Sequence, residues 1–398
     1  MTAPGGRDGP ATFARRYTKT WVHAVATAAL TAFGTLTVVD QRFAAVAIAA
    51  YVLPPVALYL RADGDDGTDG TAIASPETGA SATETEAATP SSTDATSAGA
   101  STTTAASAGV SKWTAASAPT DAHLHDAAST DTGAYAVGAD GVFLADSGAG
   151  WDALLSDGPR AQSRTLRGVD AVGDGGVWMT GDGGTVARVD PETGQHVDHS
   201  EPAGDTSNLV AVAATNGADG EIVLLGDGSG GVRRGDYRDG SVAWRDPVTP
   251  GSGSSLAGLA LRTDAGWACD TSQRVFETTD GGRSFTDSGI DDVSGTLTDV
   301  AATGAGPIVG TDDGVVYRTE SGSWTPERVS DAGISAVAGR GDRWLACGAN
   351  GAVFERTAPS DWERVTTPTA ESLNGVAVGE SRALAVGDGG TVLERDGR

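Results

Sequence analysis

Apolar residues recur at a regular interval through the C-terminal two-thirds of the chain. From residue 112 onward, a leucine or isoleucine followed by small residues and valine returns about every 41 residues, a period typical of repeat architectures. The seven positions are Leu124, Leu166, Leu209, Leu256, Leu297, Ile334 and Leu373. Residues 112–398 are therefore predicted to form an array of seven similar units.

Each unit also carries a strand–turn–strand pattern, in which two apolar runs flank Asp-Gly, Gly-Gly or Asn-Gly. Clear copies are 136–143, 179–186, 309–316, 346–353 and 386–392. Asp-Gly and Asn-Gly between apolar strands are strong hairpin signals, because both central residues of the turn take positive φ. An aromatic residue is then expected to open a further strand, at Trp151, Trp244, Phe285, Trp324 and Trp362.

Four short strands in each of seven units predict an all-β, seven-bladed β-propeller over residues 112–398. The seventh unit reaches Arg398 before its aromatic strand, and a matching segment stands at Ser111-Lys112-Trp113-Thr114. We therefore expect the strand around Trp113 to complete the last blade. Closing the ring in this way removes exposed sheet edges.

The N-terminal region has a different pattern. After a tail at residues 1–20, no charged residue occurs from Trp21 to Val39 or from Phe43 to Leu60. Each stretch would reach roughly 27 Å as a helix, close to the hydrocarbon thickness of a bilayer. Residues 21–61 are thus predicted to form a transmembrane hairpin of two helices, since nothing nearby could cover them as a buried pair.

Charges near this hairpin bear on its orientation. Basic residues flank it on the outer sides and only Arg42 lies in the connection; the flanking ones are Arg7, Arg15, Arg16, Lys19 and Arg61. The positive-inside rule then favours the cytoplasmic side of the cell membrane for the propeller. Residues 62–111 are rich in Ala, Ser and Thr and are predicted to be a disordered linker. Such stalks are often extracellular, so the orientation stays open.

The amino-acid composition excludes further classes of protein and of partner. Lys+Arg number 27 against 53 Asp+Glu, a net charge of −26. A nucleic-acid partner is not expected without a basic surface, and two cysteines exclude a disulfide scaffold. The acidic surplus resembles the proteomes of extremely halophilic archaea, where carboxylates keep surfaces hydrated at high salt.

One hairpin carries a motif with a family resemblance. Residues 278–285, TTDGGRSF, match the Asp-box pattern in full. With the Gly-rich turns, residues 112–398 resemble the YVTN/BNR-like (Asp-box) propellers, especially photosystem II assembly and stability factors. The resemblance implies that this motif has a structural role, in which Asp280 caps the turn and Phe285 packs between blades. The box residues are Thr278, Asp280, Gly282, Ser284 and Phe285.

Relatives of this kind are non-catalytic platforms that help to assemble membrane complexes, so the resemblance implies that role here. The alternative is a cell-surface glycan-binding or sialidase-like propeller, because sialidases contain the same box. A sialidase needs an arginine cluster and a Tyr nucleophile with a Glu. The propeller tyrosines, Tyr135, Tyr237 and Tyr317, do not read as loop nucleophiles. The chain is therefore not expected to be an enzyme.

Other candidate chemistry is sparse. His123 with His125, and His196 with His199, could start a metal site, but no further ligand is in reach by sequence. Cys269 and Cys347 read as buried small residues. No metal or cofactor is expected. The expected partners are a membrane-associated protein and, through residues 21–61, the bilayer. A possible partner-binding set consists of Arg167, Arg262, Arg340, Arg343 and Arg382.

Overall fold

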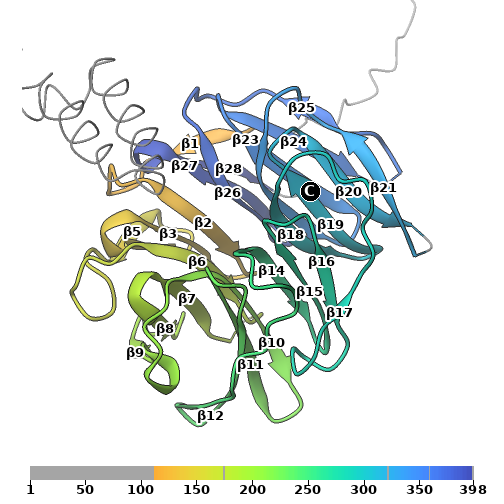
Figure 1. Cartoon of the computed structure of the whole chain (residues 1–398). Helices are drawn as coiled ribbons and strands as arrows, with labels where there is room; N and C mark the ends of the chain where they lie inside the picture. Colours follow the sequence, from red (N-terminus) through yellow and green to blue (C-terminus); the bar gives the residue numbers. More distant parts are fainter. Residues whose placement is uncertain (1–111, 174, 321, 358, 397–398) are drawn as a thin grey trace, which may run out of the picture. The chain divides into compact units, whose positions relative to one another are not determined.

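The computed structural model describes residues 112–396 except 174, 321 and 358, and these form seven four-stranded antiparallel sheets (Figure 1). The innermost strands contact one another in a closed cycle of seven. The all-β, seven-bladed propeller predicted from the repeat is thus confirmed. The predicted tail, transmembrane hairpin and linker lie outside the described residues. Among the described residues, no helix is long and apolar enough to span a bilayer.

The strands follow the chain, and each blade runs from an inner to an outer strand. Blade 1 comprises β2 (Leu124–Ser129), β3 (Ala134–Gly138), β4 (Phe143–Asp146) and β5 (Trp151–Leu155). Blade 2 comprises β6 (Leu166–Ala171), β7 (Val177–Gly181), β8 (Thr185–Val189) and β9 (His196–Asp198). Blade 3 comprises β10 (Leu209–Gly217), β11 (Gly220–Asp227), β12 (Val232–Arg238) and β13 (Ser241–Trp244). Blade 4 comprises β14 (Leu256–Arg262), β15 (Ala265–Asp270), β16 (Val275–Thr278) and β17 (Thr286–Asp287).

The remaining blades have the same order. Blade 5 comprises β18 (Leu297–Thr303), β19 (Gly306–Thr311), β20 (Val315–Glu320) and β21 (Ser323–Arg328). Blade 6 comprises β22 (Ile334–Arg340), β23 (Arg343–Gly348), β24 (Ala352–Thr357) and β25 (Glu363–Val365). Blade 7 comprises β26 (Leu373–Val378), β27 (Arg382–Gly387), β28 (Val392–Asp396) and β1 (Thr114–Ala116). Four short 3₁₀ turns are η1 (Ala139–Gly141), η2 (Asp182–Gly184), η3 (Pro202–Gly204) and η4 (Asp388–Gly390).

The recurring Leu or Ile is the first residue of every innermost strand, and all seven are buried. A register shift follows this residue in each of the seven innermost pairs, for example between Leu124 and Asp126. Such a bulge inserts one residue and leaves it outside the ladder. The sequence repeat therefore marks both the core and the bulge of each blade.

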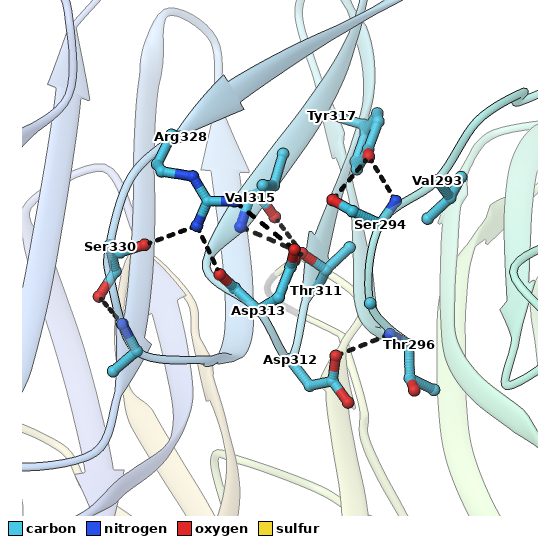
Figure 2. Close-up of polar contacts among 12 residues, drawn as sticks. Val293, Ser294, Thr296, Thr311, Asp312, Asp313, Val315, Tyr317, Arg328 and Ser330 are labelled. Atoms are coloured by element: carbon cyan, nitrogen blue, oxygen red, sulfur yellow. Dashed lines mark hydrogen bonds and ion pairs between the residues drawn. The ribbon is translucent and has the colours of Figure 1, made fainter.

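Most of the predicted hairpin turns have the expected backbone. Asp140 and Gly141 have φ of 59° and 80°, and Asn350 and Gly351 have 57° and 63°. The turn after β19 differs, because only Gly314 has positive φ there (90°). Figure 2 shows what closes it instead: the Thr311 hydroxyl donates to Val315 O at 2.9 Å and accepts from Val315 N at 3.1 Å. A side chain thus supplies the contact that two left-handed residues supply elsewhere.

The aromatic positions need one correction. Trp151 and Trp324 begin or nearly begin their strands, and Phe285 and Trp362 immediately precede theirs. Trp244 instead ends β13. The hairpin between β12 and β13 turns tightly at Asp239 and Gly240, both with positive φ, so the outer strand of blade 3 starts earlier than the aromatic residue.

The ring closes through β1, which pairs antiparallel with β28 in the last sheet. Thr114 lies opposite Glu394, and Ala116 lies opposite Val392. The side chain of Trp113 is buried in the cluster that contains Leu373 and Leu393. The two ends of the described chain are therefore held in a single blade.

A repeated contact joins the outer strands of neighbouring blades. The indole N–H of Trp113 donates to Glu355 at 2.7 Å, and that of Trp151 donates to Glu394 at 2.6 Å. Trp362 makes the same contact with Glu327 at 2.9 Å. Each carboxylate also pairs with an arginine: Arg395 with Glu355, Arg382 with Glu394, and Arg318 with Glu327. Blades 5, 6, 7 and 1 are thus linked by buried or half-buried Trp–Glu–Arg contacts.

Candidate functional site

The inner strands surround a central channel with a volume of about 660 Å³. Its wall begins near the bulges and continues to the hairpins that join the innermost and second strands of each blade. In each blade we letter the strands A to D from the innermost outward. The face that carries the hairpins between strands A and B is called the AB face, and the opposite face is called the BC face. Most wall residues are alanine and valine, for example Ala127, Val169 and Val337. Small apolar side chains leave the channel open.

Three aspartates interrupt this apolar wall, and each joins two blades. Asp126 accepts from the backbone N–H of Ala127 at 2.8 Å and of Val169, in blade 2, at 2.9 Å. Asp299 accepts in the same way from Val300 at 2.8 Å and from Val337, in blade 6, at 2.9 Å. For Asp170 the donors are Ala171 at 2.8 Å and Ala214, in blade 3, at 2.7 Å. Asp126 and Asp299 thus satisfy backbone groups next to the bulges, and Asp170 satisfies backbone groups further along β6 and β10.

The same carboxylates have unusual acidity. Desolvation raises the pKa of Asp126 to about 8, although its two backbone donors act in the opposite direction. It likewise raises the pKa of Asp299 to about 7 and of Asp170 to about 6. The neighbouring carboxylates of Asp299 and Asp170 raise the pKa of Asp126 further. The channel therefore holds groups that titrate near neutral pH.

Two of the five predicted arginines lie at the AB mouth of the channel. Arg262 ends β14 and Arg340 ends β22, and both line the channel. Arg262 donates to Thr303 O at 2.8 Å, whereas Arg340 lies 3.5 Å from Asp131 and 3.8 Å from Glu380. Both residues are exposed. The long, solvated contacts of Arg340 leave its guanidinium accessible to a partner.

The other three arginines lie elsewhere. Arg343 stands opposite Arg340 in the β22–β23 hairpin, next to the mouth. Arg382 is half-buried at the periphery of the AB face, where it pairs with Asp146 at 2.8 Å and Glu394 at 2.5 Å. Arg167 lies near the start of β6, on the BC side, and pairs with Asp182 at 2.6 Å. The five residues therefore do not form one patch.

The hairpin between β16 and β17 has a closely hydrogen-bonded loop. Asp280 accepts from the Thr278 hydroxyl at 2.8 Å, from Arg283 N at 2.9 Å, and from Ser284 N and Oγ at 3.0 and 2.6 Å. Despite partial desolvation, these donors lower the pKa of Asp280 to about 2. Gly282 N donates to Thr278 at 2.9 Å, and Phe285 packs on a cluster shared by blades 3 and 4. The loop therefore uses the Asp280 carboxylate internally, to hold its own backbone and hydroxyl groups.

The histidines and cysteines do not come together. His123 contacts Asp388 at 3.0 Å, and His196 contacts Pro159 O at 3.2 Å. His199 packs between Trp178 and Tyr237. Within residues 112–396, apart from the three undescribed positions, no group of three His, Cys, Asp or Glu side chains could hold a metal ion. Cys269 and Cys347 are both buried and free.

The tyrosines have structural contacts. Tyr135 is buried and stacks with Phe143, with ring centroids 6.0 Å apart. The buried Tyr317 hydroxyl accepts from Ser294 N at 2.9 Å (Figure 2). Tyr237 packs edge-on against Trp178 and beneath the Arg188 guanidinium. None of the three lines the channel beside Arg262 and Arg340.

Fold and channel together define the class: a closed seven-bladed propeller with an open axis. No protein-family model and no curated protein matches the chain. Solved structures do match its fold. "YCF48 bound to D1 peptide" has a TM-score of 0.57 at 14% identity, covering 72% of this chain and 95% of that chain.

Two further structures extend the comparison. "YCF48 from Cyanidioschyzon merolae" has a TM-score of 0.54 at 16% identity, covering 71% of this chain and 98% of that one. A chain of the "Crystal Structure of Mitotic Checkpoint Complex" has a TM-score of 0.58 at 12% identity, with coverage of 72% and 95%. At these identities the likeness shows a shared propeller fold.

Proposed function

We propose that this protein is a membrane-anchored, non-catalytic platform that binds a protein partner at the AB mouth of its channel. The observation that carries the proposal is the mouth itself, where Arg262 and Arg340 stand at the rim of an open channel. Such a rim can hold an acidic residue of a partner, while the channel behind it accepts the neighbouring residues.

The comparisons support a protein partner. One matching propeller is described as bound to a D1 peptide, and another belongs to the mitotic checkpoint complex. We extend this mode of use to the present chain. The apolar stretches within residues 21–61 support attachment to a membrane, and we infer that the partner belongs to a membrane complex. Charge near these stretches favours the cytoplasmic side.

A paired charge reversal tests the proposal. The full chain, with a photo-crosslinking residue at Thr263 in the AB mouth, is crosslinked in native membranes, and the adducts are identified by mass spectrometry. We expect one specific adduct, lost in the Arg262→Glu/Arg340→Glu double variant. Arg167→Glu is the matched control, because Arg167 lies on the BC side and is similarly exposed.

The outcomes separate clearly. An adduct that survives the double variant would show that Arg262 and Arg340 do not hold the partner, and this would overturn the assignment of the site to the arginine rim. The absence of any adduct above that from an unmodified propeller would reject the platform. Glycan release or sugar binding at the mouth would instead support the cell-surface glycan reading.

A further inference from the structure

A second hollow lies on the AB face, outward from the channel mouth, between blades 3 and 4, and it shares no lining residue with the channel. It has a volume of about 600 Å³, within the usual range for small-molecule sites. Its walls come from the β10–β11 and β12–β13 hairpins and from the loop of residues 278–285. We call it the side groove.

Blade 4 is short at its outer edge beside the groove. Its outermost strand, β17, has only two residues, whereas β13 of blade 3 has four. The β13 residues Ser241, Val242 and Ala243, with the following Arg245, line the groove.

Arginines gather in this groove although the whole chain has a net charge of −26. Four line it: Arg234, Arg238, Arg245 and Arg283. The lining carboxylates are Asp219, Asp236, Asp264 and Glu221. Two of these carboxylates are paired: Arg188, outside the groove, lies 2.6 Å from Glu221, and Arg238 lies 3.2 Å from Asp219. The lining thus carries equal numbers of guanidinium and carboxylate groups, in a chain that is strongly acidic as a whole.

Two of these arginines have guanidinium N–H groups that a ligand can reach. Arg245 shares the single carboxylate of Asp236 with Arg234, and about half of its side chain is exposed. Arg283 is exposed, and in the described part of the chain no carboxylate lies within ion-pair distance of it. Guanidinium forks bind carboxylate and phosphate groups in a bidentate manner. Both residues can therefore accept an anion from solvent.

A buried arginine fixes the groove in advance. Arg234 is 3% exposed and donates to Asp236 through Nε at 3.1 Å and to the carbonyl oxygen of Gly281 in the facing loop. It thereby ties the wall of blade 3 to the loop that carries Arg283. Binding to a preformed site avoids the entropy cost of ordering its walls.

We propose that the side groove binds a small organic polyanion bearing two or more carboxylate or phosphate groups, with Arg245 and Arg283 as its ligands. This site is separate from the AB mouth, and the proposal does not depend on the channel binding a protein. It gives the propeller a small-molecule site at the junction of two blades.

Calorimetry with citrate and with fructose 1,6-bisphosphate, at constant ionic strength, tests the proposal on the full chain in detergent, and hexaglutamate serves as a comparison ligand. We expect saturable binding of at least one of the two small anions. The Arg245→Gln/Arg283→Gln double variant should weaken it at least tenfold. Arg364→Gln, which removes an exposed arginine in blade 6, should leave it unchanged. Equal unfolding midpoints for all three proteins verify that the fold is intact.

Three results would overturn the proposal. The first is no saturable binding of either anion to the natural chain. The second is equal affinity in the double variant, and the third is binding of hexaglutamate alone, which would make the groove a peptide site. None of these results would affect the crosslinking test at the AB mouth.

Discussion

The Trp113 indole and the Glu355 carboxylate meet at 2.7 Å, although 242 positions separate them in sequence. This contact joins the outermost strand of the last blade to the blade before it, so it reports ring closure directly. We expect Trp113→Ala to lower the free energy of unfolding by about 3–5 kcal/mol, because a buried indole is lost. Denaturant titration at constant salt measures this.

The Trp113→Phe variant separates packing from hydrogen bonding. It keeps one aromatic ring, but loses the donor to Glu355, which still pairs with Arg395, and part of the buried ring. The expected loss is about 1–2 kcal/mol, from one hydrogen bond and the smaller ring together. If Trp113→Ala unfolds at the same denaturant midpoint as the natural chain, the ring does not depend on this strand.

The channel aspartates should make stability fall as the pH rises above neutrality. Their folded pKa values, about 8, 7 and 6, exceed the ordinary value of 3.8, so the folded state binds more protons between these limits. Their contribution is complete below pH 3.8 and is lost as the pH rises through the folded values. Unfolding free energies from pH 6.5 to 9 should decrease, and Asp126→Ala should flatten the slope.

Two histidines act in the opposite direction at the lower end of this pH range. Desolvation lowers the pKa of His125 and His199 below the ordinary 6.5, so the unfolded chain binds more protons there and their contribution to stability grows as the pH rises. The comparison with Asp126→Ala separates the aspartate effect from this one, because both proteins keep the histidines. A slope that is the same in Asp126→Ala and in the natural chain would show that this carboxyl is ionised throughout.

Asp280 should show the opposite dependence. Its pKa is lowered to about 2, so its contribution is present above pH 3.8 and disappears as the pH falls through about 2. We expect Asp280→Ala to cost about 1–3 kcal/mol at pH 7, because four donors in the loop lose a charged acceptor. Thermal unfolding at pH 7 and pH 2.5 checks this: the difference between the two proteins should shrink at the lower pH.

Arg382 holds two carboxylates at the junction of blades 7 and 1. Although desolvation acts to raise it, the hydrogen bonds from Arg382, Gly148 and Gly150 keep the pKa of Asp146 below its ordinary value. Arg382→Ala leaves the buried Asp146 charge without its cation, so we expect a loss of roughly 1–3 kcal/mol. The control, Arg364→Ala, should change stability by less than about 0.5 kcal/mol. Equal effects of the two substitutions would contradict a special role for Arg382.

The architecture could be predicted from the sequence because the repeated residues are the ones that pack in the core of each blade. Leu124 and its six equivalents are buried at the start of each inner strand, and the Asp-Gly turns take the expected backbone. The match of Trp113 with other aromatic strands likewise indicated the seventh sheet. These features are local and recur seven times, so they are visible in one chain.

The channel aspartates and the groove arginines could not be predicted in the same way, because their contacts lie in a neighbouring blade and the repeat does not indicate them. Asp126 and Asp299 share a position two residues after the recurring Leu, a possible signal, but Asp170 lies two residues further on. Their link to the next blade arises only when the ring forms. Similarly, Arg234 and Arg283 are 49 positions apart, and the short β17 beside the groove carries no distinctive sequence.

Among the strands that the structure describes, β1 is the first, and it completes the sheet of β28. The chain that precedes Lys112 is therefore connected directly to the strand that closes the ring. Tension applied along the polypeptide from its N-terminal side would pull first on three residue pairs, while the inner strands stay protected by neighbours on both sides. Mechanical load from this side would thus detach β1 from β28 and open the ring, while the other six sheets keep all their strands.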